Sequence, residues 1–177
     1  MPAMKKRIAL ISTGGTIEKT YDELSGVLAN GVSVLDVMLA SIELRGVEIM
    51  RVQLMNKDSL EMTAADHTLI AETAENMARV TAGVVIVHGT DRLAASGHRI
   101  YELCQASAPL SAPIVLTGAM RPYELRSTDA LQNLIEALLA VQLLAPGVYV
   151  AMHNQVLQFP GVDKDRSAGT FVKSVTT

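Results

Sequence analysis

Aromatic residues and cysteine are the scarcest components of this sequence. Aromatics make up 3% of its 177 residues, tryptophan is absent, and Cys104 is the only cysteine. A lone cysteine excludes an internal disulfide and a cysteine-rich metal site. With a hydrophobic content of 49%, the core has to be built from valine, isoleucine, leucine, methionine and alanine. The length suits one α/β domain that can bury a substantial core.

Positive charge is scarce as well. The chain has 15 lysines and arginines against 18 acidic residues, a net charge of −3, and its basic residues form no stripe. This excludes the basic footprint of a nucleic-acid-binding protein. Lys5, Lys6 and Arg7 precede an apolar run, as in a signal peptide, but that run ends at Thr13 and is too short for one. We therefore expect a cytoplasmic protein with neither a nucleic-acid nor a membrane partner.

Several common catalytic signatures are missing. The chain lacks the Gly-Lys-Ser/Thr ending of a phosphate-binding loop, the G-x-G-x-x-G dinucleotide fingerprint and the G-x-S-x-G elbow of serine hydrolases. Its four histidines, His67, His88, His98 and His153, lack the spacing of metal ligands. We interpret His98 as a helix-face residue and His88 as a residue that positions its loop. The sequence thus predicts no metal and no cofactor.

The apolar pattern alternates between short strands and helices. Strand-like runs occupy Ile8–Ser12, Gly46–Leu54, Gly83–Val87, Pro113–Leu116 and Val148–Met152. Thr63 and Ser127 are the expected N-caps of two of the helices, and His153-Asn154 is expected to turn a closing hairpin. Strands that alternate with helices indicate βαβ units. We therefore expect a single domain over residues 1–177, a three-layer α/β fold with a mostly parallel β-sheet flanked by helices, Rossmann-like or flavodoxin-like.

Three of these strands end alike. The segments "ISTGGT", "VHGTD" and "LTGAMRP" each leave a strand through a turn of small residues that carries a hydroxyl. Ligands of open parallel sheets bind beyond the carboxyl ends of the strands. One glycine-threonine turn is more often an ordinary loop, but three of them at one sheet edge indicate a binding site.

Threonine hydroxyls are the main reactive groups at this edge. A threonine hydroxyl is a poor nucleophile until a neighbouring base or cation activates it. Tyr21 or Lys164 could activate Thr16, which follows two glycines. The alternative is a plain glycine turn, with Lys164 paired to Asp163 or Asp165 at the surface, where ion pairs are common.

Four separated motifs carry a family resemblance. "TGGTIE" resembles the first signature, and "HGTDRL" the second, of the bacterial-type L-asparaginases, two-domain amidohydrolases that convert asparagine into aspartate and ammonia. "GAMRPYELRSTDALQN" is similar to a third block of that family, and "VLQFPGVDK" to the stretch that delivers its lysine. The resemblance covers the amino-terminal domain of the family and implies its fold, a cofactor-free L-asparaginase activity and L-asparagine as the substrate.

The resemblance also implies a role for each matching residue. Thr16 would be the nucleophile, with Tyr21 on a mobile loop to take its proton, and Thr90 would be a second hydroxyl connected to Lys164. Asp91 would complete the catalytic group and hold the substrate's α-ammonium. The remaining substrate-binding positions are Gly15, Asp58, Ser59, Gly89 and Ala119. Ser59 matches the site of the α-carboxylate, and the backbone of Ala119 matches that of the side-chain amide.

The chain also departs from the family. Glu18 and Arg92 each lie two residues after a catalytic threonine, where the family has a small residue and a threonine, and we expect them to pair across the crevice mouth. The family's C-terminal domain is absent from the sequence, so we expect a short, single-domain form that assembles as a homodimer or homotetramer. Two other functions stay open, a catalytically idle module that binds an amino acid and an ammonia donor of the glutaminase or amidotransferase type.

Overall fold

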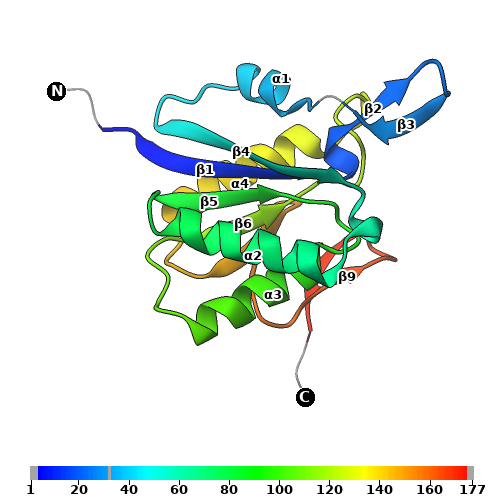
Figure 1. Ribbon diagram of the computed structural model, residues 1–177. Coiled ribbons are helices and arrows are strands. Elements are labelled where there is room, and N and C mark those ends of the chain that lie inside the picture. The colour runs from blue at the N-terminus through cyan, green and yellow to red at the C-terminus, as the bar shows by residue number, and fades with distance from the viewer. Residues whose placement is uncertain (1–3, 32, 175–177) are drawn as a thin grey trace.

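A central six-stranded sheet runs through the computed structural model, which describes residues 4–31 and 33–174 (Figure 1). In spatial order, its strands are β4 (Val47–Lys57), β1 (Lys6–Gly14), β5 (Gly83–Val87), β6 (Ile114–Thr117), β7 (Val148–Met152) and β8 (Gln155–Gln158). Neighbouring strands are parallel except β7 and β8, which form an antiparallel pair. The predicted mostly parallel sheet is confirmed.

Helices cover both faces of this sheet. On one face lie α1 (Leu35–Ala40) and α4 (Ala130–Leu143), and on the other α2 (Ala64–Ala78) and α3 (Leu93–Ala106). Ile8 and Leu10 of β1 belong to the core under α1 and α4, whereas Ala9 and Ile11 belong to the core under α2 and α3. Successive side chains of a strand point to opposite faces, so a strand covered on both sides is apolar throughout. The predicted three-layer architecture is confirmed.

Two short hairpins stand at the carboxyl ends of the parallel strands, at the right of Figure 1. They are formed by β2 (Lys19–Asp22) with β3 (Val27–Asn30), and by β9 (Val162–Asp165) with β10 (Thr170–Lys173). The sequence did not predict either hairpin. The predicted turn at His153-Asn154 is confirmed, because both residues have positive φ values, of 53° and 61°, between β7 and β8.

The helix N-caps agree with the sequence in one case of two. Thr63 caps α2 in a capping box, since its hydroxyl accepts the N–H of Asp66 at 3.3 Å and the Asp66 carboxylate accepts the N–H of Thr63 at 2.8 Å. The prediction of Ser127 as the cap of α4 is wrong, because Asp129 occupies that position. The chain is still in a turn at Ser127, since Thr128 N–H donates to the carbonyl of Leu125 at 3.1 Å.

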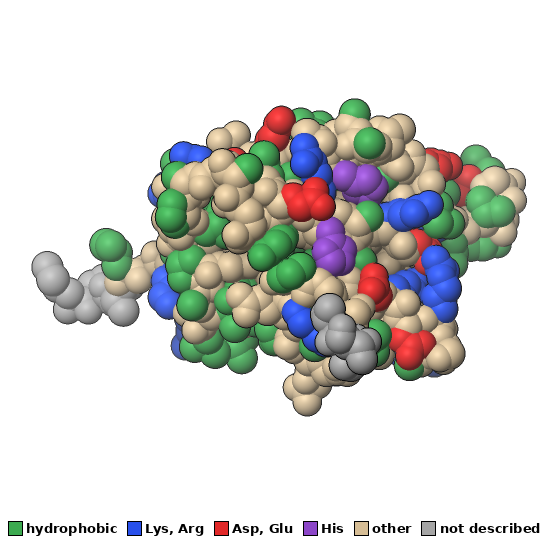
Figure 2. All heavy atoms as spheres, turned by 90° about the horizontal axis from the view of Figure 1, so that it is seen from below, with side chains coloured by type: hydrophobic (Ala, Val, Ile, Leu, Met, Phe, Trp, Pro, Cys, Tyr) green, Lys and Arg blue, Asp and Glu red, His purple; other side chains and the backbone are tan. Residues whose placement is uncertain are grey.

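The face turned to the viewer in Figure 2 carries basic, acidic and apolar side chains intermixed, with no continuous basic area. Among the helices of the described residues, none is both long and apolar enough to span a bilayer.

Candidate active site

The turns that follow β1, β5 and β6 form the candidate site. These strands are adjacent and parallel, so their carboxyl ends lie at one edge of the sheet. Gly15 and Thr16 follow β1, Gly89 and Thr90 follow β5, and Ala119 lies in the turn after β6. The three similar strand ends of the sequence are thus brought side by side.

Backbone contacts hold the first two turns together. Gly15 has φ 86°, and a Cβ at that position would lie 2.5 Å from the Cα of Gly89. A Cβ on Gly89 would in turn lie 2.6 Å from the Oγ of Ser59. Both glycines are therefore required by close approach, and Gly15 also by its left-handed backbone. The structure brings these three predicted binding residues into one contact group, in which Ser59 is 1% exposed.

Thr90, Asp91 and Lys164 form a hydrogen-bonded group. The Lys164 ammonium, delivered by β9, donates to Thr90 Oγ1 at 2.9 Å and to Asp91 Oδ1 at 2.8 Å. The hydrogen bond from Lys164 is the main reason that the pKa of Asp91 lies below its ordinary value. Asp91 is therefore a carboxylate at neutral pH.

The alternative surface pairing of Lys164 is wrong. Asp165 accepts hydrogen bonds from Ser167 and from the N–H of Ala168, and Asp163 accepts one from Ser174.

Arg166 is a member of the site that the sequence analysis missed. Its Nη1 donates to Asp91 Oδ1 at 3.0 Å, so one carboxylate oxygen receives hydrogen bonds from two cations. The Arg166 side chain is 71% exposed, whereas that of Lys164 is 15% exposed. Its place two residues after Lys164 was the only signal in the sequence. Arg166 therefore lies on the solvent-exposed side of Asp91.

Thr16 and Tyr21 lie on consecutive elements, the 3-10 turn after β1 and strand β2. Thr16 begins a 3-10 turn (Thr16–Glu18) and is half-buried, and within residues 4–31 and 33–174 no group forms a hydrogen bond with its hydroxyl. Tyr21 lies on β2 and is 59% exposed, while its backbone N–H donates to the Glu124 carboxylate. The expected mobile loop is thus a β-hairpin, and no hydrogen bond joins these two described residues.

Asp58 is engaged by the same hairpin. It caps the 3-10 turn Ser59–Glu61, and its carboxylate accepts a hydrogen bond from the Lys19 ammonium at 2.8 Å. This bond, followed by that from the N–H of Leu60, lowers the pKa of Asp58. Lys19, which the sequence analysis also missed, therefore ties the start of β2 to the segment that carries Ser59.

Glu18 does not pair with Arg92, and that prediction is wrong. Glu18 is 3% exposed, and its carboxylate accepts hydrogen bonds from Gly14 N–H at 3.2 Å and from Ser33 Oγ at 2.6 Å. Burial raises its pKa despite these hydrogen bonds. Arg92 instead lies exposed at the start of α3. Glu18 is therefore a buried carboxylate that holds the backbone of the glycine turn through Gly14.

His88 supports the second turn. Its ring is fully buried, with Nδ1 2.8 Å from the carbonyl oxygen of Gly89 and Nε2 2.7 Å from Ser96 Oγ. Since a carbonyl only accepts, Nδ1 carries the hydrogen and Nε2 accepts from the Ser96 hydroxyl. Burial lowers the pKa of His88 to about 4, so the ring is neutral at pH 7. The interpretation of His88 as a loop-positioning residue is confirmed by these contacts.

His98 lies on α3, as expected, and its Nε2 is 3.1 Å from the carbonyl oxygen of Val162 at the start of β9.

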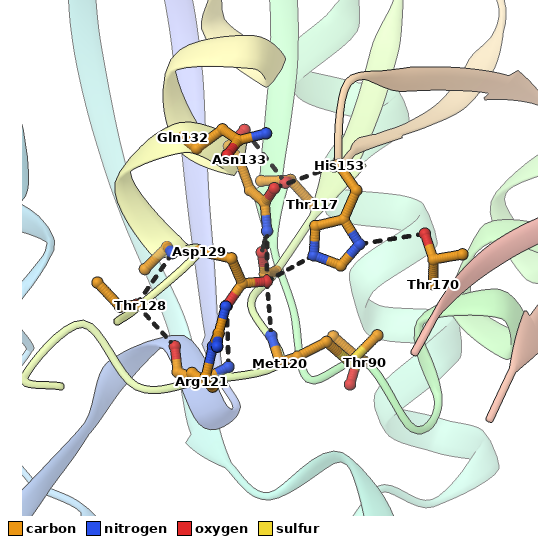
Figure 3. A network of polar contacts seen from close by, with 12 residues as sticks. Thr90, Thr117, Met120, Arg121, Thr128, Asp129, Gln132, Asn133, His153 and Thr170 are labelled. Carbon is orange, nitrogen blue, oxygen red and sulfur yellow. Dashed lines mark hydrogen bonds and ion pairs between the residues drawn. The ribbon is translucent and has the colours of Figure 1, made fainter. Parts of the chain in front are cut away.

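The turn after β6 is held by the N-terminal end of α4 (Figure 3). Asp129 accepts hydrogen bonds from the N–H groups of Met120 and Arg121, each at 3.0 Å. Asn133 donates to the carbonyl of Gly118 at 2.9 Å. The backbone of Ala119, which is 1% exposed, is therefore fixed between these anchors. Within the described ranges, no three histidine, cysteine, aspartate or glutamate side chains are grouped so as to hold a metal ion.

Comparisons with known proteins identify relatives of this chain. A profile of the family described as "Asparaginase, N-terminal" matches residues 7–172. The chain is 31% identical over 165 residues to the L-asparaginase of Thermococcus kodakarensis, covering 92% of this chain and 49% of that protein. It is 29% identical over 153 residues to a glutamyl-tRNA(Gln) amidotransferase subunit of Methanococcus vannielii, covering 85% of this chain and 35% of that protein.

Solved structures show the same likeness. The thermostable L-asparaginase from Thermococcus kodakarensis superposes with a TM-score of 0.83 at 31% identity, over 94% of this chain and 51% of that chain. A probable cytoplasmic L-asparaginase from Campylobacter jejuni gives a TM-score of 0.75 at 30% identity, over 96% of this chain and 52% of that chain. The chain thus spans about half, or less, of the length of these relatives. Because the family profile extends over nearly all of its residues, the chain belongs to the asparaginase family, whose amino-terminal domain it matches.

Proposed function

We propose that this chain is the catalytic domain of an L-asparaginase, which hydrolyses L-asparagine to L-aspartate and ammonia. The observation that carries the proposal is the hydrogen-bonded group of Lys164, Thr90 and Asp91, at 2.9 and 2.8 Å, beside the glycine turn that presents Thr16. Membership of the asparaginase family and the relatives named L-asparaginase support it. We further propose that residues 1–177 act as one domain.

In the proposed reaction, the Thr16 hydroxyl attacks the side-chain amide carbon of asparagine. The carbon–nitrogen bond breaks, the nitrogen leaves as ammonia with the proton that Thr16 gives up, and an ester to Thr16 remains. Water then cleaves the ester, which releases aspartate and restores the hydroxyl. Backbone N–H groups of the turns would stabilise the oxyanion of each step, because preorganised donors cost no reorganisation during the reaction. Direct attack by water, with Thr16 as a polarising group, is a closely related route.

Lys164 and Thr90 would serve the proton transfers. In the ion-paired state, Lys164 is a hydrogen-bond donor to Thr90 Oγ1, which leaves the hydroxyl hydrogen of Thr90 free to donate to the substrate or to water. Once Lys164 has passed a proton on, it can act as a base toward Thr90. Activity should rise from acid toward neutral or mildly alkaline pH, because Asp91 has to be a carboxylate to hold the α-ammonium.

The remaining groups would bind the two ends of the amino acid. Asp91 would hold the α-ammonium through its second carboxylate oxygen, since Oδ1 is shared by Lys164 and Arg166. Ser59 would bind the α-carboxylate, and the Lys19 ammonium beside Asp58 offsets the negative charge that would otherwise repel it. Tyr21, on the β2–β3 hairpin, would relay the proton that Thr16 gives up.

A second candidate function is release of ammonia for transfer to another molecule. It is favoured by relatives that are named as components of a glutamyl-tRNA(Gln) amidotransferase, which would make glutamine hydrolysis and a partner protein relevant. A third is the idle module that binds an amino acid without turnover.

One assay separates these functions. Ammonia release is measured from L-asparagine, L-glutamine and D-asparagine, with Thr16→Ala as the matched inactive variant and calorimetric binding of each amino acid alongside. Turnover of L-asparagine that Thr16→Ala abolishes supports the asparaginase. Preference for glutamine supports the ammonia donor. Binding without turnover by the unchanged chain would contradict both enzymatic functions and support the idle module.

We also propose that the protein is cytoplasmic and self-associates, as a homodimer or homotetramer. The second proposal is supported by three apolar side chains of α4, Ile135, Leu139 and Leu143, which are 43%, 57% and 76% exposed at a spacing of four residues.

A further inference from the structure

His153 occupies a position that its local turn does not explain. It is the first residue of the two-residue connection between β7 and β8, with φ 53°, and Asn154 follows with φ 61°. Asparagine, aspartate and glycine are the usual residues of such a turn. An imidazole at this point is therefore not required by the hairpin, and its contacts lie elsewhere.

The ring of His153 links two segments that are distant in the sequence (Figure 3). Nε2 lies 2.7 Å from Asp129 Oδ2, and Nδ1 lies 3.1 Å from Thr170 Oγ1. The carboxylate only accepts, so Nε2 donates to it, and in the neutral ring Nδ1 accepts from the Thr170 hydroxyl. One imidazole thus joins the start of α4 to β10.

On the α4 side, the hydrogen bonds lead to the turn that contains Ala119. Asp129 is 7% exposed and binds the N–H groups of Met120 and Arg121. Burial works to raise its pKa, but these N–H groups and the His153 ring outweigh burial and hold the pKa below its ordinary value. The carboxylate therefore stays charged, and its hydrogen bond from His153 is charge-assisted.

Asn133 reinforces this side of the network. Its Nδ2 donates to Asp129 Oδ2 and to the Gly118 carbonyl, both at 2.9 Å, and its Oδ1 accepts the backbone N–H of His153 at 3.1 Å. The backbone and the ring of His153 are thus both connected to the turn after β6.

On the other side, the hydrogen bond from Thr170 connects His153 to the β9–β10 hairpin, which carries Lys164. Thr170 is the partner of Asp165 in the β9–β10 ladder, and the next residue, Phe171, is the partner of Lys164. Holding Thr170 therefore holds the two-stranded unit from which the Lys164 side chain reaches Thr90.

We propose that His153 is a positioning residue that couples the turn carrying Ala119 to the hairpin carrying Lys164, so that the amide-binding backbone and the proton-transferring lysine keep a fixed relation. The inference rests on the proposed function of the site, because only catalysis requires these two parts to be aligned. His153 itself touches neither Thr90 nor Lys164 by a hydrogen bond within the described residues.

Two variants separate the two sides of the link. His153→Asn keeps a residue that tolerates the left-handed backbone but is too short to bridge both partners, whereas Thr170→Val removes only the hydroxyl and keeps the shape of the side chain. Thr73→Val, which removes an exposed hydroxyl on α2 far from the network, is the matched control.

Amide hydrogen exchange tests the coupling directly. In His153→Asn, exchange is expected to rise about tenfold in residues 118–121 and also in residues 162–173, the scale of losing one hydrogen bond in each segment. Thr170→Val should raise it only in residues 162–173, and Thr73→Val in neither. Unchanged exchange in either segment of His153→Asn would overturn the proposed coupling.

Kinetics of ammonia release test the positioning role. Both variants should lower kcat about tenfold with KM changed less than about twofold, and the double variant should lose no more than His153→Asn alone, because both substitutions break the same link. A raised KM with unchanged kcat would overturn the assignment. If the unchanged chain releases no ammonia from any amide, the proposed function fails, and the exchange experiment decides the coupling separately.

Discussion

The two threonines of the site differ in how fully the protein surrounds them. The hydroxyl of Thr90 accepts a hydrogen bond from Lys164 at 2.9 Å, and the residue as a whole is 4% exposed. The hydroxyl is therefore oriented before any ligand arrives. Thr16 is half-buried, and no described group binds its hydroxyl. Such an arrangement suits a nucleophile whose partner arrives with the substrate or with a moving segment, whereas Thr90 is preorganised.

The first prediction concerns these hydroxyls. Thr16→Ala and Thr90→Ala should each lower kcat for asparagine by a factor on the order of 10³ or more, the scale of losing one member of a catalytic unit. Ammonia release measures turnover, and calorimetry should show that asparagine still binds to at least one of the two variants. Thr73→Ala, a half-buried threonine of α2 whose hydroxyl binds only its own helix among the described residues, is the control and should behave as the unchanged chain. Near-normal turnover in either site variant would refute that threonine's assignment.

The second prediction concerns the buried ring of His88 and the stability of the protein in acid. Its pKa is lowered by burial to about 4 from 6.5, so the unfolded chain takes up a proton at a higher pH than the folded protein does. This contribution to the free energy of unfolding is fully present above pH 6.5 and is lost as the pH falls from 6.5 to about 4. At 1.36 kcal/mol per pKa unit, the loss amounts to about 3 kcal/mol.

Urea unfolding of the unchanged chain and of His88→Asn at neutral and at mildly acidic pH measures this contribution. Asparagine keeps a donor for the Gly89 carbonyl but does not titrate, so the variant should lose less stability between pH 6.5 and pH 4. Equal losses in the two proteins would contradict the assignment of a neutral His88.

At the level of elements, the β2–β3 hairpin is a largely exposed part of the candidate site. Three of the four residues of β3 are exposed, and the hydrogen bonds that tie the hairpin to the body include that of Lys19 with Asp58 and that of Tyr21 N–H with Glu124. Elements with few buried contacts open at low free-energy cost. We therefore expect the hairpin to open more readily than the central strands of the sheet, which are buried on both faces.

The third prediction tests the Lys19 attachment. Lys19→Met keeps the length of the side chain but removes the ion pair, so the hairpin should be cleaved faster in limited proteolysis and KM for asparagine should rise about two- to fivefold, as expected for one partly exposed pair. Arg45→Met is the matched control, because it removes an ion pair that is almost fully exposed and distant from the site. An unchanged cleavage rate and KM in Lys19→Met would contradict the role of this pair.

The elements that the sequence revealed are those buried on both sides. The middle of β1, Ile8 to Ile11, and nearly all of β5 are consecutive apolar residues because helices cover both faces of the sheet, and that pattern is readable without a structure. The hairpins β2–β3 and β9–β10 were missed because their four-residue strands are short and have no apolar alternation. The six-residue helix α1 is likewise too short to show a helical period.

The site was predictable only in part, for a related reason. Thr16, Thr90 and Asp91 lie in local motifs, so their positions follow from the sequence next to them. Three other residues bind partners that are distant in the chain, namely Arg166, Lys19 and His153. The sequence around them does not indicate which residues those partners are. The expected pair of Glu18 and Arg92 failed because the direction of a side chain at a turn depends on the backbone there.

At the level of the whole molecule, the exposed apolar face of α4 carries the fourth prediction. Ile135 and Leu139 line a groove of about 410 Å³ together with Ile42 and Leu44, and Leu143, one helical turn after Leu139, is 76% exposed. Light scattering on the unchanged chain should show a dimer or tetramer. Leu139→Glu should shift it toward the monomer, because a buried charge without a partner is costly.

Val80→Glu is the control for that experiment, since Val80 is 65% exposed but lies outside this face. A monomer in the unchanged chain, or an equal effect of both substitutions, would contradict self-association through α4.

The contact between Gly15 and Gly89 has a consequence for altering the protein. The two turns meet backbone to backbone, with no side chain between them. A larger residue at Gly15 or Gly89 would therefore have to deform the chain, so the spacing of the two turns is not open to substitution. A change of substrate size has to come from parts that can be exchanged, namely the β2–β3 hairpin and the exposed Arg166. Libraries that vary those segments while leaving the glycines intact would test other amides and keep the proposed reactive groups in place.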